Sequence, residues 1–383
     1  MGPRLKAGLA NRLAFADLLR GLAALAVVIG HYSILYLTEP HIISAVTLGE
    51  PTRAVPVPEG LASILSWFNF PAIGVAVFFL ISGFVIPLSL EGTDTRAYFL
   101  KRFLRIFPTY WIALGIGVAA LFVSAFYWSK PVPITTLDYI GNALLLSNAL
   151  SYTRSDILSV AWTLQIEIKF YLLAPFIYMA LKRGLLLPVL LCGLAVLGVY
   201  WNATALCDGV HIACWDHYRF GVRMLWFDAM FMVFMLIGSL FYAQYRKLLR
   251  SWQVIAGVIF LVGCYQAAVS AAPLPELATD RRVPYLWGLA IFACLYFMRD
   301  SVTLTRPFRF LADIMAHGAP YIVALPVALS LVIGLATIMY LYVEAPLIAF
   351  GKRFSKAWFG ARKNGKVVVP EAAQALDLPA VHA

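Results

Sequence analysis

The stretch FADLLRGLAALAVVIGHYSILYL, residues 15–37, is apolar enough after Asp17 to cross a membrane, yet it keeps Arg20 and His31. About 20 apolar residues in a helix span the ~30 Å hydrocarbon core of a bilayer. Ionisable groups inside such a span are costly and suggest a function by default. The two side chains, at positions 20 and 31, point to one face of a helix about 16 Å apart along its axis. The stretch predicts a membrane helix with a functional pair, although Arg20 alone could simply extend to the headgroups.

The whole chain has the composition of an integral membrane protein. It has 383 residues, of which 62% are hydrophobic and 13% are charged, whereas soluble domains average about 25% charged residues. The apolar runs are too continuous for the alternating strands of an outer-membrane barrel. The sequence therefore predicts an all-α, polytopic helical bundle. Ten transmembrane helices are expected, at about residues 15–37, 66–90, 107–128, 160–181, 184–201, 224–243, 252–271, 284–299, 308–325 and 326–348.

The net charge of +11 comes mostly from short basic stretches between the predicted spans. This positive-inside pattern predicts that both termini are cytoplasmic, and it argues against a nucleic-acid partner. We expect a multi-pass protein of a cell membrane, the inner membrane in a bacterium. Three segments are predicted: a cytoplasmic segment at 1–14, one transmembrane domain at 15–350, and a basic, disordered tail at 351–383.

The loops offer two weaker features. The run YIGNALLLSNAL, residues 139–150, is too short to cross a bilayer and is expected to be re-entrant or interfacial. Cys207 and Cys214 share a predicted outer loop, in which a disulfide can form.

A second polar group lies in the stretch SVAWTLQIEIKFYLLAPF, residues 159–176. Glu167 falls about two turns into a predicted helix that enters from outside, and Tyr171, four residues later, shares its face. A buried, unpaired carboxylate is expensive, so we expect Glu167 to pair or to stay protonated. Counted from the outer ends of their spans, Glu167 and His31 have equal depth, about 9 Å. We therefore expect the two side chains to meet directly or through one water, unless Glu167 forms a purely structural ion pair.

A third feature is YFLKRFLRIFPTYW, residues 98–111, where Arg102 and Arg105 lie one turn apart near the cytoplasmic surface. The spacing alone favours a positive-inside anchor with an aromatic belt. The alternative is a cradle for the phosphates of a cytoplasmic ligand, because the arginine fork matches phosphate oxygens. The sequence contains no HExxH, CxxC pair, Walker loop or GxSxG, so no metal site is predicted.

These residues resemble the motifs of a membrane family called acyltransferase family 3. Its hallmark is a basic residue and a histidine separated by ten residues in the first span, here Arg20 and His31. Four further motifs follow in order: FF-x-x-SGF at 78–84, R-x-x-R-I-x-P-x-Y at 102–110, W-x-L-x-x-E-x-x-FY at 162–171, and E-x-P at 344–346. The usual ISYxxYxxH segment is replaced by FLADIMAHGAPYIVAL, residues 310–325, which reaches His317 without the tyrosines.

The resemblance implies transfer of an acyl group, most often acetyl, from coenzyme A to a hydroxyl of a sugar or lipid-linked glycan. Arg20, Arg102 and Arg105 would hold the anionic donor, and acetyl-CoA would be a substrate, with no permanently bound cofactor. His31 would take the proton of the acceptor hydroxyl, a role that suits an imidazole at neutral pH, and Glu167 would orient it. An acyl-histidine intermediate is a variant of this mechanism. Further candidate site residues are Ser82, Trp162, Tyr171 and Glu344.

Two other classes of function would also fit buried Arg, His and Glu residues. A transporter of a lipid or small solute should show paired broken helices or internal repeats, and the sequence shows no convincing pair. A membrane scaffold would have no need of Arg20 and His31 on one helix face. The expected partners are acyl-CoA, a glycan acceptor and the bilayer; homo-oligomers and other proteins of envelope-glycan assembly stay open.

Overall fold

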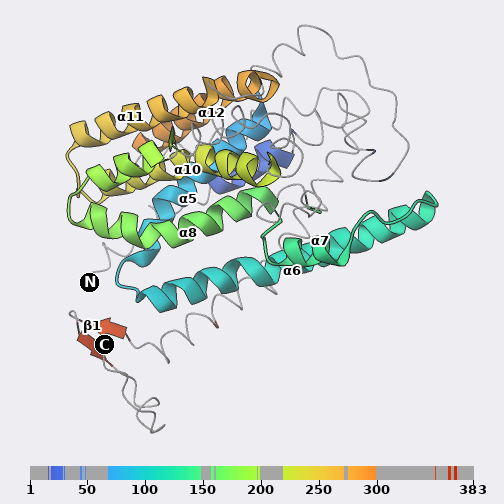
Figure 1. Cartoon of the computed structure of the whole chain (residues 1–383). Helices are drawn as coiled ribbons and strands as arrows, with labels where there is room; N and C mark the ends of the chain where they lie inside the picture. Colours follow the sequence, from blue (N-terminus) through green and yellow to red (C-terminus); the bar gives the residue numbers. More distant parts are fainter. Residues whose placement is uncertain are drawn as a thin grey trace. The chain divides into compact units, whose positions relative to one another are not determined.

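A computed structural model of the chain (Figure 1) describes about half of the residues. Its described residues are 16, 19–28, 30, 44, 48, 68–147, 157–158, 161–195, 197–198, 219–270, 275–298, 350, 361–363 and 366–368. Several predicted features lie outside them: the last two predicted spans, His31, Cys207, Cys214, His317 and Glu344.

The described part is almost entirely helical, as predicted. Four helices are long and apolar enough to cross a membrane by length and composition: α5 (Phe70–Leu90), α6 (Thr95–Tyr127), α8 (Ala161–Lys182) and α11 (Ser251–Ser270). Further helices are α7 (Thr136–Ala143), α10 (Arg219–Tyr245), α12 (Pro275–Phe297) and the shorter apolar helix Leu19–Val28. Residues 187–195, within the predicted span 184–201, are helical as well. The helical membrane-type fold is thus confirmed, whereas ten spans and cytoplasmic termini stay predictions.

The chain forms two compact units. The first contains Met1–Leu88 and Gly117–Thr303, and the second contains Ser89–Ile116 and Leu304–Ala383. Helix α6 begins in the second unit and ends in the first.

Helix α10 forms the centre of the first unit. It contacts α8 and α11, and α11 contacts α12 (Figure 1). Its residues from Met230 to Ala243 are almost all buried. Aromatic rings of the neighbouring helices converge on it: Phe231 lies 5.7 Å from Phe79 of α5 and 5.1 Å from Tyr285 of α12, measured between ring centroids. Large aromatic side chains therefore fill the core of this unit.

The backbones of α5 and α10 touch at two glycines. A Cβ on Gly83 would lie 2.0 Å from the carbonyl oxygen of Met235, and one on Gly238 would lie 2.2 Å from that of Leu80. Across this contact, the Ser239 hydroxyl donates to the Gly83 carbonyl at 3.0 Å. Small residues at a helix crossing allow such an approach inside a membrane protein.

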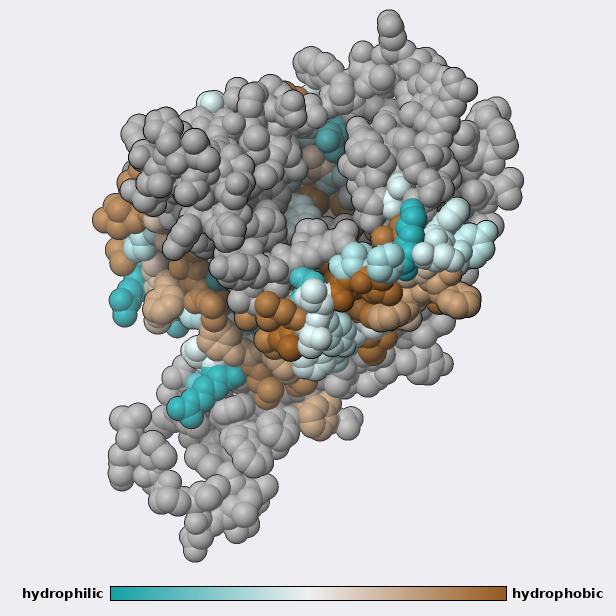
Figure 2. All heavy atoms as spheres, turned by 45° about the vertical axis from the view of Figure 1, so that its right-hand side comes forward, coloured by the Kyte–Doolittle hydropathy of each residue, from teal (hydrophilic) through white to brown (hydrophobic). Residues whose placement is uncertain are grey.

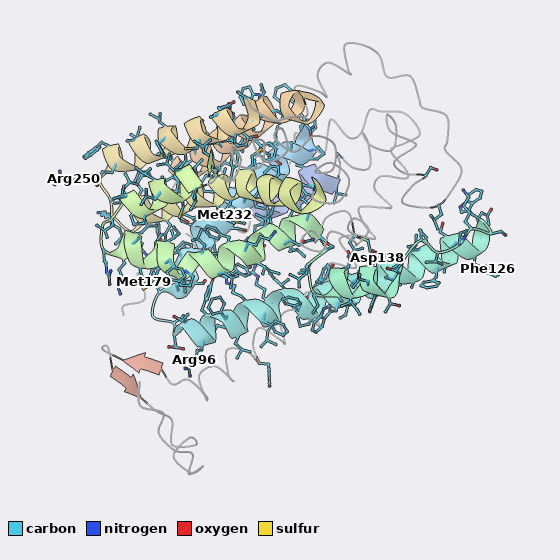
Figure 3. All side chains as sticks on the ribbon, in the orientation of Figure 1. Arg96, Phe126, Asp138, Met179, Met232 and Arg250 are labelled. Atoms are coloured by element: carbon cyan, nitrogen blue, oxygen red, sulfur yellow. The ribbon has the colours of Figure 1, made fainter. Side chains whose placement is uncertain are left out.

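Basic residues collect at one end of the first unit. Helix α8 ends at Lys182 and Arg183 follows it, and the loop between α10 and α11 carries Arg246, Lys247 and Arg250. The two loops are neighbours, because a Cβ on Gly184 would lie 3.7 Å from the Leu248 carbonyl oxygen. Figure 3 shows Arg250 and Met179, near the end of α8, at this same end of the helices. The clustering is what the positive-inside pattern predicts for two loops on one side of a membrane.

The outward faces of the helices are largely apolar. Exposed side chains include Phe126 of α6, Phe176 of α8 and Ile259 of α11. In the face drawn in Figure 2, brown apolar residues outnumber teal polar ones among the coloured atoms. Such a surface suits contact with hydrocarbon and is unusual for a soluble protein.

The second unit includes a short β-hairpin inside the tail that the sequence predicts to be disordered. Strands β1 (Ala361–Lys363) and β2 (Lys366–Val368) pair antiparallel, with Lys363 opposite Lys366. The two residues between the strands in the sequence are Asn364 and Gly365, the pair most typical of a tight hairpin turn. The rest of the segment 351–383 lies outside the described residues, so the predicted disorder of the tail stays a prediction.

The α5–α10 contact yields a stability prediction. Gly83→Ala should lower the stability of the folded state by about 1 to 3 kcal/mol, because the added methyl group forces the two backbones apart. Gly263→Ala is the matched control, since a Cβ there meets nothing within 4 Å, and it should be neutral or stabilising by about 0.5 to 1 kcal/mol. Thermal unfolding in detergent measures both, and equal melting temperatures for the two variants would contradict the close contact.

Candidate functional site

Glu167 is the buried acidic group of the candidate site. Its side chain on α8 is 8% exposed. The Tyr171 hydroxyl, one turn further along the helix, donates to Oε1 at 2.6 Å, and the Ser82 hydroxyl of α5 reaches the same oxygen at 3.5 Å. The first distance is that of a strong hydrogen bond to a carboxylate, and the second is long. The predicted sharing of a helix face by Glu167 and Tyr171 is confirmed.

Both hydroxyls meet one oxygen of the carboxylate. Among the described residues, no hydrogen bond reaches Oε2. A carboxylate oxygen that is buried in an apolar bundle needs a donor or a cation to offset its desolvation. Oε2 is therefore the atom that is available for a catalytic partner or for a substrate hydroxyl.

The close helix contact fixes the position of Ser82. Ser82 directly precedes Gly83, whose carbonyl accepts from Ser239 across the α5–α10 contact. Ser82 is 2% exposed. Because the backbone at this point has no room to shift, the Ser82 hydroxyl approaches Glu167 from a fixed direction.

Aromatic side chains form a wall beside this cluster. Trp162, in the first turn of α8, has its ring 6.1 Å from Phe79 and 5.2 Å from Phe231, and Phe170 is fully buried. The structure thus places the candidate Trp162 in the aromatic core of the first unit. Rings in this position keep bulk water away from the carboxylate on the core side, which strengthens electrostatic interactions there.

The helix that carries Arg20 packs antiparallel against α5. A Cβ on Gly74 would lie 2.6 Å from the Ala23 carbonyl oxygen, and one on Gly30 would lie 2.1 Å from the side chain of Pro71. Arg20 is half-buried and makes contacts of its own. Because the two helices run in opposite directions, Arg20 lies on the Ser82 side of this contact, and Gly30 lies on the far side.

The starts of α5 and α8 are staggered. Trp162 meets Phe79, which lies about 12 Å along α5 from Pro71. Ser82, which meets Glu167, lies about 16 Å from Pro71. The equal depth expected for His31 and Glu167 assumed that the outer ends of all the helices lie in one plane, and the outer ends of α5 and α8 do not. His31 itself lies outside the described residues, so its pairing with Glu167 stays a prediction.

The two arginines of the predicted phosphate cradle lie on α6 in the second unit, whereas Glu167 belongs to the first. Arg102 is only 6% exposed; its guanidinium donates to the Ser89 hydroxyl and lies 5.5 Å from the centroid of the Tyr98 ring. Arg105 is half-buried. Arg102 is thus held in place by the protein, and Arg105 is the more accessible of the pair.

Sequence reasoning missed one polar group near the site. Gln165, two residues before Glu167, is 2% exposed, and its amide donates to the Ser147 hydroxyl at 2.8 Å. A polar side chain inside an apolar span is a candidate for a functional role. This reasoning drew attention to Glu167, and it applies equally to Gln165.

Comparison with known proteins places the chain among acyltransferases. A family profile described as an acyltransferase domain, Acyl_transf_3, matches residues 13–315. The chain is 32% identical over 145 residues to nodulation protein 10 of Rhizobium leguminosarum bv. viciae, which covers 34% of this chain and 39% of that protein. It is 36% identical over 109 residues to the exopolysaccharide production protein ExoZ of Rhizobium meliloti (strain 1021), covering 27% and 33%.

The name of a third relative describes a chemical reaction. The chain is 26% identical over 157 residues to the peptidoglycan O-acetyltransferase OatA of Listeria monocytogenes, covering 36% of this chain and 25% of that protein. In each of these three relatives the match spans well under half of the relative's length. No solved structure is detectably similar to the chain.

The hydrogen bonds of Glu167 yield a second stability prediction. Tyr171→Phe should lower stability by about 1 to 3 kcal/mol, because it leaves the buried carboxyl oxygen without its short hydrogen bond. Ser82→Ala should cost less, because the contact at 3.5 Å is longer. Melting temperatures in detergent provide the measurement, and a larger loss for Ser82→Ala than for Tyr171→Phe would refute this ranking of the two bonds.

Proposed function

The chain belongs to the Acyl_transf_3 family of acyltransferase domains, and we propose that it is an integral membrane O-acyltransferase. The proposed reaction transfers an acyl group, most often acetyl, from cytoplasmic acyl-CoA to a hydroxyl of a sugar or lipid-linked glycan. The observation that carries the proposal is the buried Glu167–Tyr171–Ser82 cluster inside apolar helices. A carboxylate kept at such a place suits proton transfer better than it suits packing.

His31 is the proposed general base. It takes the proton of the acceptor hydroxyl as the oxygen attacks the thioester carbonyl carbon. The carbon–sulfur bond then breaks, and the leaving thiolate of coenzyme A takes up a proton. The products are an ester and free coenzyme A. Proton transfer by a positioned imidazole accounts for about 10² to 10⁴ in rate.

Glu167 is proposed to orient the imidazole and to stabilise the imidazolium that forms. Oε1 is occupied by the two hydroxyls, so Oε2 is the atom that would face His31. Gly30, next to His31 in the chain, packs against Pro71, about 16 Å along α5 from Ser82. This stagger is longer than a direct hydrogen bond or one bridging water spans, so the two side chains must reach toward each other for the pair to form.

The arginines are proposed to bind the phosphates of the donor. Arg105, the more accessible, would contact them directly, and Arg102, fixed by Ser89 and Tyr98, would contribute charge and shape. Arg20, in the first unit, is proposed as a further contact for the donor. Guanidinium groups suit this task because their planar forks bind phosphate oxygens in pairs.

A glycan acceptor is supported by the relatives. One is named for exopolysaccharide production and another as a peptidoglycan O-acetyltransferase. We propose that the chain modifies a glycan of the cell envelope from within the membrane, with ten spans and both termini in the cytoplasm. The basic loops gathered at one end of the first unit support this orientation.

The catalytic pair is tested by two substitutions. His31→Ala should eliminate transfer of labelled acetyl from acetyl-CoA in reconstituted membranes, because the proton acceptor is lost. Glu167→Gln should lower kcat by about 10² or more while donor binding survives, because the amide cannot stabilise an imidazolium equally. Lys169→Gln, two residues along α8 on another face, is the matched control and should stay near the wild-type rate. Full turnover by His31→Ala or Glu167→Gln would remove that residue from the mechanism.

Donor binding is tested on α6. Arg105→Ala should raise the apparent KM for acetyl-CoA roughly tenfold or more, because a charge-assisted contact is worth about 1.5 to 3 kcal/mol. Arg96→Ala, in the exposed first turn of the same helix, serves as the control and should leave KM unchanged. An unchanged KM in a well-expressed Arg105→Ala protein would reduce this residue to a topological anchor.

A further inference from the structure

Helix α7 is amphipathic, but it buries its polar residues and exposes its apolar ones. A helix on the surface of a soluble protein does the opposite. Its polar residues Asp138 and Asn142 are buried, Asn142 completely. Its apolar residues Leu137 and Ile140, and Leu144 just after it, are exposed, Leu144 to 50%. In water the preference would be the opposite, because exposed apolar area is unfavourable and buried polar groups need partners.

Every buried polar side chain of this segment has found a partner within the protein. Asp138 forms a capping box with Thr135 at the start of the helix. The Asn142 amide donates to the Asp138 carbonyl at 2.9 Å, and its oxygen accepts from the Ile157 backbone at 2.9 Å. The Ser147 hydroxyl accepts from Gln165 at 2.8 Å. Internal satisfaction of this kind is what a chain at membrane depth requires, since no water is present to supply the bonds.

The bond between Ser147 and Gln165 gives the depth of the segment. Gln165 lies four residues after Ala161, where α8 begins, and therefore about 6 Å into that helix. The chain after α7 must reach this level for the bond to form. Glu167 lies about 3 Å deeper on the same helix, so the polar face of the segment approaches the level of the candidate site.

The exposed side of the segment has no charged side chain, and its exposed polar groups in α7 are the hydroxyls of Thr136 and Tyr139. Between Pro131 and Ser147 the only charged residue is Asp138, and it is buried. The helix that precedes the segment ends in exposed apolar residues of the same unit, Phe122, Val123 and Phe126. The chain then passes Trp128 and Lys130, the residue types that mark a membrane–water interface, before it turns back into α7. Figure 3 shows Asp138 on α7 and Phe126 near the end of α6.

We infer that residues 136–147 form a re-entrant wedge whose apolar face contacts the acyl chains of membrane lipids. The face consists of Leu137, Ile140, Leu144 and Leu146. The polar face, fastened to α8 through Gln165, separates this lipid contact from the level of Glu167. The inference concerns the surface of the fold and holds whether or not the proposed transfer reaction is correct.

The test is photo-crosslinking to lipid. The full chain is made with p-benzoylphenylalanine in place of Ile140 or of Leu144 and reconstituted in vesicles of phosphatidylethanolamine and phosphatidylglycerol. After irradiation, mass spectrometry of the protein is expected to show phospholipid adducts at both positions. The probe at Ile259, on the exposed face of α11, serves as the positive control, and the probe at Lys130 as the negative one.

The outcomes separate the alternatives. Adduct yields at positions 140 and 144 that match position 259 support the lipid-facing wedge. Crosslinks to the chain itself or to a second copy would overturn it, because protein would then cover the face. Yields no higher than at position 130 would also overturn it and place the face against water. Each position is an independent probe, so misfolding of one variant, seen by size-exclusion chromatography, leaves the other decisive.

Discussion

The close approach of α5 to its neighbours is the constraint on which the rest of the structure depends. Glycines allow it on three sides: Gly74 toward the helix of Arg20, Gly83 and Gly238 at the contact with α10, and Gly288 of α12, where a Cβ would lie 2.6 Å from the Ala76 side chain. A bundle without a hydrophobic driving force between its helices gains cohesion from such contacts. Because α5 cannot shift, the Ser82 hydroxyl and the level of Arg20 are fixed relative to Glu167.

The buried carboxylate shows why that rigidity matters. A carboxyl group in an apolar bundle is tolerable only with donors that do not move away. Tyr171 comes from the same helix and therefore moves with Glu167, whereas Ser82 belongs to α5 and depends on the glycine contact to stay near. The cluster thus combines the Tyr171–Glu167 hydrogen bond within α8 with the packing of α5 against α10, which holds Ser82. The aromatic wall of Phe79, Trp162 and Phe231 lies beside it.

The helices were predictable, because runs of apolar residues determine them directly, and so was the helix face that Glu167 shares with Tyr171. The start of α6 was not. The predicted span begins at about residue 107, yet the helix already begins at Thr95, since long cationic side chains are compatible with a helix that extends beyond the hydrocarbon. The depth of Glu167 relative to residues of the neighbouring helices could not be predicted either. It depends on the stagger between α5 and α8, which results from aromatic packing and not from span length. The hairpin was readable from Asn364-Gly365 and was overlooked in a segment judged by composition alone.

Helix α6 has a mechanical consequence. Its 33 residues make a rod of about 50 Å, well beyond the ~30 Å hydrocarbon core. Its interior contains Pro108, which lacks the N–H that would bond to the Leu104 carbonyl. That missing bond falls just after Arg105 and well before the residues that belong to the first unit. Bending of the helix would concentrate at this point, so the direction of the Arg105 side chain depends on one absent backbone hydrogen bond.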